Sequence, residues 1–183
     1  MDGSKRADYI GAMGRRSIAL AMFLVGCGGA QATGPAFLAR GDVAPDFMAL
    51  DQHGEVRQLH LLRRRRPLVL FFYPRDGTPG CTEEACAFRD AWDRLQSSGA
   101  VVVGVSTDGV EAHRAFAEEH GLPFPLLSDP EGRVLERYGV PSALGMAARV
   151  TYVIDREGRI ARVYPDVDPA VHVTEVLSVI ESL

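Results

Sequence analysis

Two cysteines stand where an apolar stretch of the chain gives way to an amphipathic one. Cys81 and Cys86 lie in the segment FFYPRDGTPGCTEEAC, which begins at Phe71 and ends at Cys86. The nucleophilic form of cysteine is the thiolate, which is scarce at neutral pH unless its surroundings stabilise it. The unpaired N–H groups and the positive dipole end of a helix provide such stabilisation. Cys81 is therefore a candidate nucleophile if a helix begins beside it.

The flanking residues predict that helix start. The apolar run 67–73 has the length and the β-branched and aromatic content of a buried strand, and Pro74 ends it. The following segment repeats apolar residues at spacings of three and four, namely Ala85, Phe88, Trp92 and Leu95. We therefore expect Cys81 in or just before the first turn of a helix.

The spacing of the two cysteines limits how they can react with each other. In a helix, residues i and i+5 have Cα atoms about 8.7 Å apart and side chains about 140° apart in azimuth. A disulfide needs a Cα separation of roughly 4.4 to 6.8 Å. Cys81 and Cys86 could pair only if the first helical turn unwinds.

These residues resemble a known family. The pattern Pro74-x-x-x-Thr78-x-x-Cys81 resembles the active site of the peroxiredoxins, and residues 78–90 resemble the peroxiredoxin Q, or bacterioferritin comigratory protein, branch. The resemblance implies that Cys81 is the peroxidatic cysteine and that Cys86 is the resolving cysteine of an intrachain disulfide. It also implies a thioredoxin-like α/β fold of three layers, in which helices flank a central mixed sheet and an N-terminal β-hairpin precedes it.

The implied activity is that of a thiol-dependent peroxidase, serving antioxidant defence. Its substrates would be hydrogen peroxide and organic hydroperoxides, and a thioredoxin-like or other dithiol would reduce it again. The resemblance implies no metal and no bound cofactor. It assigns the Thr78 hydroxyl to bonding the thiolate and the peroxide, Pro74 to shielding the site, and Arg149 to the active-site arginine.

Elementary chemistry agrees with the role of the arginine. A guanidinium beside the sulfur favours the thiolate and can bind peroxide oxygens while negative charge grows on the leaving oxygen. Glu84, three residues after Cys81, would oppose the thiolate by like-charge repulsion. We therefore expect its carboxylate to be held by a cation or by a backbone N–H.

Each assignment has a structural alternative. Cys81 and Cys86 could be small core residues, Thr78 a helix N-cap, and Arg149 an ordinary arginine at a strand entry. Five histidines show no metal-ligand spacing and are interpreted as surface or packing residues: His53, His60, His113, His120 and His172.

Two other functional classes share some of these features. A lipid-anchored copper protein of the Sco type has a thioredoxin-like fold and a cysteine pair, but with three intervening residues and a working histidine. A membrane-tethered disulfide reductase uses a Cys-x-x-Cys pair. Here four residues separate Cys81 from Cys86, which favours the peroxidase.

The composition indicates one catalytic domain, expected over residues 41–183. The formal charge of −4 leaves no basic footprint for nucleic acid. Residues 63–66 form a run of four arginines, interpreted as a solvated loop, with a phosphate or membrane-surface role as the alternative.

The sequence between Tyr138 and Arg149 is shorter and more apolar than in the family, which would suit organic hydroperoxides, a weak dimer contact or the membrane. A monomer is otherwise expected.

The N-terminus resembles a bacterial lipoprotein signal. Arg15 and Arg16 precede the apolar stretch 18–25, which is too short to span a bilayer, and Leu24-Val25-Gly26-Cys27 resembles a lipobox. We expect residues 1–27 to be the signal segment, Cys27 to carry the lipid, and residues 28–40 to be a flexible tether. The enzyme would then be exported and anchored to a bacterial membrane. A plain secretion signal, a start at Met13 and a cytoplasmic protein with an unused signal are the alternatives.

The remaining elements follow from periodicity and turn residues. Strands are expected at 46–50, 55–59, 100–106, 124–127, 150–154 and 160–164, and helices at 110–120, 131–138 and 171–183.

Overall fold

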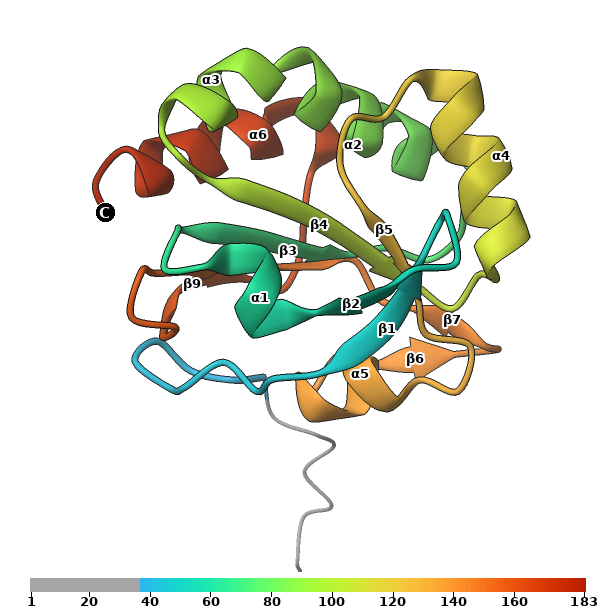
Figure 1. Ribbon diagram of the computed structural model, residues 1–183, viewed down its shortest axis with the longest axis horizontal. Helices are drawn as coiled ribbons and strands as arrows, with labels where there is room; N and C mark the ends of the chain where they lie inside the picture. The colour runs from blue at the N-terminus through green and yellow to red at the C-terminus, as the bar shows by residue number, and fades with distance from the viewer. Residues whose placement is uncertain (1–36) are drawn as a thin grey trace, which may run out of the picture. The chain divides into compact units, whose positions relative to one another are not determined.

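A seven-stranded mixed sheet forms the centre of the protein. The computed structural model describes residues 37–183 (Figure 1), and the strand order of the sheet is β2-β1-β5-β4-β3-β8-β9. Its strands are β1 (Met48–Asp51), β2 (Val56–Gln58), β3 (Leu68–Phe72), β4 (Val101–Ser106), β5 (Leu126–Ser128), β8 (Val150–Ile154) and β9 (Ile160–Tyr164). The helices are α1 (Leu59–Arg63), α2 (Pro79–Asp90), α3 (Trp92–Ser97), α4 (Val110–His120), α5 (Arg133–Arg137) and α6 (Pro169–Ile180).

The central strands are buried on both faces. β3 pairs in parallel with β4 and antiparallel with β8, and β4 pairs in parallel with β5. Every residue of β3, β4 and β8 is buried. These strands are apolar without alternation because helices and loops cover both of their faces.

Two apolar cores separate the sheet from its covering layers. The first contains Val69 and Phe71 of β3 together with residues of α2, α3, α4 and α6. The second contains Leu68 and Leu70, which point the other way, together with residues of α1 and α5. Figure 1 shows the two groups of helices on opposite sides of the sheet. The predicted α/β, thioredoxin-like arrangement and its N-terminal hairpin, β1 with β2, are confirmed.

Two local features differ from the sequence-based expectations. The helix after Cys81 is interrupted at Ala91, whose φ of −90° and ψ of 6° separate α2 from α3. Leu59 begins α1 instead of ending a strand, because it turns into the second core, where it is buried. The short, apolar segment between Tyr138 and Arg149 is buried near its ends, at Val140 and Ala147, and exposed over residues 141–145. A small hairpin, β6 (Ser142–Ala143) and β7 (Met146–Ala147), exposes Leu144 at its tip.

The chain enters the fold along the second core. Leu38 is half-buried against that core, and Gly41 donates its backbone N–H to the carbonyl oxygen of Ile160 at 2.8 Å. Cys27 and most of the expected tether lie outside the described residues. Within residues 37–183, no helix is both long and apolar enough to cross a membrane.

Candidate active site

Cys81 lies in the first turn of α2, as the sequence predicted. Thr78 is the N-cap residue and Pro79 the first helical residue, so Cys81 is the third. Its side chain is 1% exposed and packs in the first core with Ala85 and Phe88. The sulfur therefore lies at the positive end of the α2 dipole, which favours a negatively charged sulfur.

The sheet brings Arg149 to this thiol from 68 residues further along the chain. Phe72, the last residue of β3, is the cross-strand partner of Val150, the first residue of β8. Because β3 and β8 are antiparallel, the end of β3 that leads to Cys81 lies beside the start of β8, which Arg149 precedes. Nη2 of Arg149 donates a hydrogen bond to Sγ of Cys81 at 3.3 Å.

Glu84 holds the other side of the guanidinium. Nη1 of Arg149 donates to Oε2 of Glu84, whose side chain is fully buried. The expectation that a cation would hold this carboxylate is therefore confirmed. Burial raises the pKa of Glu84 to about 7, and the opposite charge of Arg149 offsets part of that rise. Oε1 of Glu84 has no hydrogen-bond partner within residues 37–183.

Gly80 leaves the space that the arginine occupies. A Cβ built on Gly80 would lie 3.2 Å from Nη2 of Arg149, closer than ordinary van der Waals contact. The glycine just before the nucleophile therefore allows the guanidinium to approach the helix N-terminus.

Pro74 and Thr78 lie on the loop between β3 and α2, and both are partly exposed. The Thr78 hydroxyl donates to the carbonyl oxygen of Arg75 at 3.0 Å. The expected bond from this hydroxyl to the Cys81 thiolate is not formed. A hydroxyl has a single proton to donate, and here the acceptor is the backbone carbonyl oxygen of Arg75. Rotation about the Thr78 side chain would be needed to release it.

Cys86 is five residues further along the same continuous helix and is half-buried. Both Cys81 and Cys86 are free thiols. The guanidinium of Arg89 interacts electrostatically with Cys86 and is held by the carbonyl oxygen of His120 at 2.7 Å. This arginine beside the second thiol was not recognised from the sequence, although a cation three residues from a cysteine on a helix was a usable signal.

A buried network of hydrogen bonds holds Asp76, in the loop between β3 and α2. Oδ2 of Asp76 lies 2.7 Å from Nδ1 of His113, and the Tyr73 hydroxyl donates to Oδ1 of Asp76 at 2.7 Å. The backbone N–H of Asp76 donates to Asp108, which also accepts a hydrogen bond from the Ser106 hydroxyl. The interpretation of His113 as a surface or packing residue missed this network. Its position on the buried face of α4, three residues before Phe116, was the available signal.

His172 is the second buried histidine near the site. Its Nε2 lies 2.9 Å from Oγ1 of Thr151, and its ring packs edge-on against Phe88 and Tyr164. Burial, together with a smaller effect of the positive charge of Arg149, lowers the pKa of His172 to about 4. His172 is therefore neutral at physiological pH.

The arrangement joins a buried sulfur nucleophile to a fixed cation. A guanidinium that donates to the sulfur also has donors for an incoming oxygen, so it can stabilise charge on both reacting partners. Within residues 37–183, no group of three His, Cys, Asp or Glu side chains is arranged to hold a metal ion.

Comparisons with known proteins agree with this chemistry. Residues 40–163 match the model of the AhpC/TSA family. The chain is 42% identical over 149 residues to a chloroplastic peroxiredoxin Q of Triticum aestivum, an alignment that covers 80% of this chain and 68% of the relative.

Solved structures show the same likeness. The peroxidoxin BcpB of Mycobacterium tuberculosis superposes with a TM-score of 0.76 at 38% identity, covering 80% of this chain and 98% of that one. The bacterioferritin comigratory protein of Xanthomonas campestris superposes with a TM-score of 0.72 at 28% identity, with coverage of 80% and 98%. The family match over more than half of the chain, together with these relatives, shows that this chain belongs to the AhpC/TSA family as a peroxiredoxin, a thiol-dependent peroxidase.

Proposed function

We propose that the protein reduces hydrogen peroxide and organic hydroperoxides with Cys81 as the peroxidatic cysteine and Cys86 as the resolving cysteine. The observation that carries the first assignment is the hydrogen bond from Arg149 to the buried Cys81 sulfur at the start of α2. The alkyl peroxide reduction activity of the Xanthomonas campestris relative supports the wider substrate range.

In the first step the Cys81 thiolate attacks one oxygen of the hydroperoxide. An S–O bond forms, the O–O bond breaks, and the leaving oxygen takes a proton to become water or an alcohol. The sulfur is oxidised to a sulfenic acid. Arg149 stabilises the charge that grows on the leaving oxygen, Thr78 rotates from Arg75 to the peroxide, and Pro74 limits access of water.

In the second step the Cys86 sulfur attacks the sulfenic sulfur of Cys81. An S–S bond forms and the sulfenic oxygen leaves as water. Because α2 is continuous from Pro79 to Asp90, its first turn must unwind before the two sulfurs can meet. An external dithiol, of the thioredoxin type or another, then reduces the disulfide and allows α2 to refold.

Stoichiometric oxidation tests this cycle. In the Cys27→Ser background, Cys81 and Cys86 are the only thiols. One equivalent of hydrogen peroxide should remove both thiols and lower the mass by two hydrogens. Cys86→Ser in that background should instead add one oxygen, which a dimedone adduct on Cys81 would identify.

The control is Cys81→Ser in the same background, which keeps Cys86 beside Arg89. It should lose its remaining thiol only at the rate of a small free thiol. Rapid loss of Cys86 in this variant would overturn the assignment of roles. Intermolecular disulfides in place of the intrachain bond would overturn the resolving role of Cys86 alone.

We also propose that the enzyme is exported and lipid-anchored through Cys27, and that its catalytic unit is a monomer. The lipobox-like residues before Cys27 support the anchor. In a bacterial expression host, mass spectrometry of the membrane fraction should find Cys27 as a diacylated N-terminus, and Cys27→Ala should abolish the modification. Recovery of unprocessed chains in the cytoplasm would contradict the proposal.

A further inference from the structure

Exposed apolar side chains gather on the N-terminal hairpin and α1, away from the active site. Leu50 of β1 and Val56 of β2 are direct cross-strand partners, and Met48 lies on the same face as Leu50. Their exposed fractions are 42%, 66% and 67%, and Leu61 of α1 is 55% exposed. A cluster of this kind costs free energy in water unless a partner covers it.

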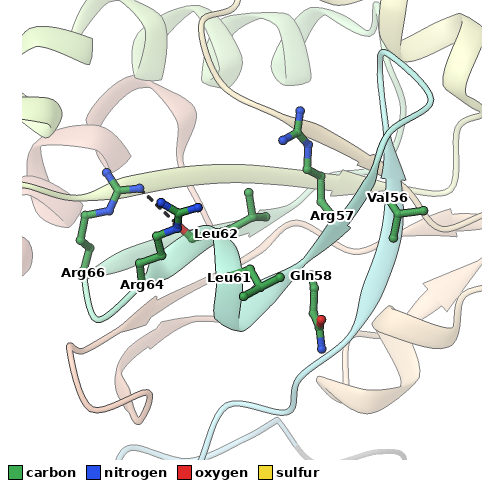
Figure 2. Close-up of a pocket in the computed structure, with 7 residues that line it drawn as sticks. All are labelled: Val56, Arg57, Gln58, Leu61, Leu62, Arg64 and Arg66. Carbon is green, nitrogen blue, oxygen red and sulfur yellow. Dashed lines mark hydrogen bonds between the residues drawn. The ribbon is translucent and has the colours of Figure 1, made fainter.

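The same region contains a shallow pocket beside two arginines. Val56 and Leu61 line a shallow pocket of about 380 Å³ together with Arg64 and Arg66, and Figure 2 draws these side chains. We call the surface formed by Met48, Leu50, Val56, Leu61, Arg64 and Arg66 the hairpin face.

The arginines of the hairpin face carry uncompensated charge. Arg66 donates only to the backbone carbonyl oxygens of Leu62 and Arg63. Among the nine ion pairs found within residues 37–183, none involves an arginine of the run 63–66. Two acids of the hairpin region are already paired, Glu55 with Arg57 and Asp46 with His60. Glu157 lies elsewhere, in a separate pocket that it lines with Arg63 and Arg65.

The backbone of this turn is unusual for arginine. Arg64 has φ of 42° and Arg65 has φ of 62°, both in the left-handed region. Glycine or asparagine adopts this conformation at lower free energy than arginine does. At Arg64 this conformation ends α1, where the backbone N–H of Arg64 donates to the carbonyl oxygen of His60.

We propose that the hairpin face docks onto the surface of an anionic lipid bilayer. Apolar side chains beside unpaired arginines match an acyl interface beneath negatively charged headgroups. Arg64 and Arg66 have no carboxylate partner within residues 37–183, so both guanidinium charges remain available to the negatively charged headgroups of a lipid surface. The chain as a whole has a net charge of −4, so the attraction depends on this local face.

Docking through this face would leave the catalytic residues accessible. The arginine turn immediately precedes β3, whereas the loop to Cys81 leaves the other end of the same strand. Five residues of strand separate these two ends by roughly 16 Å. The proposal requires neither peroxidase activity nor lipidation of Cys27, although an anchor would strengthen the docking.

A fluorescent label tests the orientation. In the full chain with Cys27, Cys81 and Cys86 changed to Ser, Leu61→Cys carries an environment-sensitive fluorophore. The matched control is Val171→Cys on α6, which is 52% exposed at wild type. Vesicles of phosphatidylcholine with phosphatidylglycerol should shift the emission of the label at position 61 to the blue but not that at position 171. Phosphatidylcholine alone or high salt should give no shift.

Removal of the charges provides a second measurement. In the Cys27→Ser chain, Arg64→Gln with Arg66→Gln should weaken sedimentation with anionic vesicles about 30-fold, because each arginine near such a surface contributes about a factor of five. Peroxide reduction in solution should not change. Equal shifts at positions 61 and 171, equal binding to neutral vesicles, or a shift at position 61 caused by protein concentration alone would overturn the proposal. The last result would identify a second copy of the chain as the occupant.

Discussion

The buried carboxylate of Glu84 and the guanidinium of Arg149 are joined by a hydrogen bond, although the two residues are 65 positions apart in the chain. Glu84 lies one helical turn after Cys81 in α2, and the guanidinium of Arg149 donates hydrogen bonds to both side chains. The carboxylate orients the guanidinium but also places a negative charge close to the sulfur, and the balance depends on whether Glu84 is ionised.

Replacing Glu84 by Gln should change the pH dependence of peroxide reduction. Burial raises the pKa of Glu84 to about 7, so the wild-type carboxyl group ionises between about pH 6 and 8. The neutral glutamine keeps an oxygen for Arg149 and removes the like charge. The thiolate of Cys81 should then form at lower pH, and the inflection near pH 7 in the rate constant for peroxide should disappear. Ultraviolet thiolate absorbance and stopped-flow kinetics measure the two effects, and an unchanged thiolate titration would contradict the prediction.

Arg149→Lys should slow the reaction with peroxide by about 100-fold, the usual cost of losing an oriented donor in a catalytic site. A lysine ammonium keeps the charge but cannot present the fixed fork that reaches both Cys81 and Glu84. Arg94→Lys, at an exposed pair with Glu181, is the matched control and should leave the rate unchanged. The second-order rate constant for hydrogen peroxide decides the matter, and wild-type kinetics in Arg149→Lys would exclude a geometric role.

Gly80→Ala should separate stability from activity. The added Cβ would lie 3.2 Å from Nη2 of Arg149, so the guanidinium must move by a few tenths of an ångström. We expect a loss of about 10-fold in rate, because small misplacements of reacting groups are costly. The helix itself should gain about 0.5–1 kcal/mol from the replacement of glycine by alanine. Gly109→Ala is the control, since its Cβ would meet nothing closer than Oε2 of Glu111 at 3.9 Å. A Gly80→Ala enzyme with full activity would show that the close approach is unimportant.

Sequence alone predicted the parts of the site that local patterns determine. The strand before Pro74 and the helix start at Cys81 follow from hydrophobic period and from an N1 proline, which act over a few residues. The break at Ala91 was missed because the apolar period continues from Phe88 through it to Leu95. One turn of helix in α1 and the two-residue strands of β6 and β7 are too short to carry a period.

The distant contacts of the site could not be derived from the residues. Arg149 was selected only by family resemblance, since its place beside Cys81 depends on the pairing of β3 with β8. The contact of His113 with Asp76 spans 37 residues and depends on how α4 packs against the loop. Local periodicity has no information about such pairings.

His172 should make the protein sensitive to acid. Burial lowers the pKa of His172 from 6.5 to about 4, so between these values the unfolded chain binds a proton that the folded protein does not. Stability should therefore fall by up to about 3 kcal/mol as the pH drops from 6.5 to 4. Glu84 acts in the opposite direction, because its raised pKa lowers stability as the pH rises from 4.5 to about 7. His172→Gln keeps a hydrogen-bonding group for Thr151 and should lose this part of the acid dependence. Urea unfolding at a series of pH values measures it, and parallel curves for the two proteins would contradict the prediction.

The bond between His113 and Asp76 should position the loop that carries Pro74 and Thr78. His113→Leu leaves the buried carboxylate of Asp76 without this partner, which should cost about 1–3 kcal/mol of unfolding free energy. His113→Asn places an amide N–H close to the former Nδ1 and should recover part of that loss. If the network serves catalysis, the leucine variant should also raise the KM for peroxide more than it lowers kcat, and asparagine should restore the KM. Because Cys81 is held by α2 and Arg149, its reaction with a small alkylating reagent should change little. A loss of stability in His113→Leu with an unchanged KM would restrict the network to a structural role.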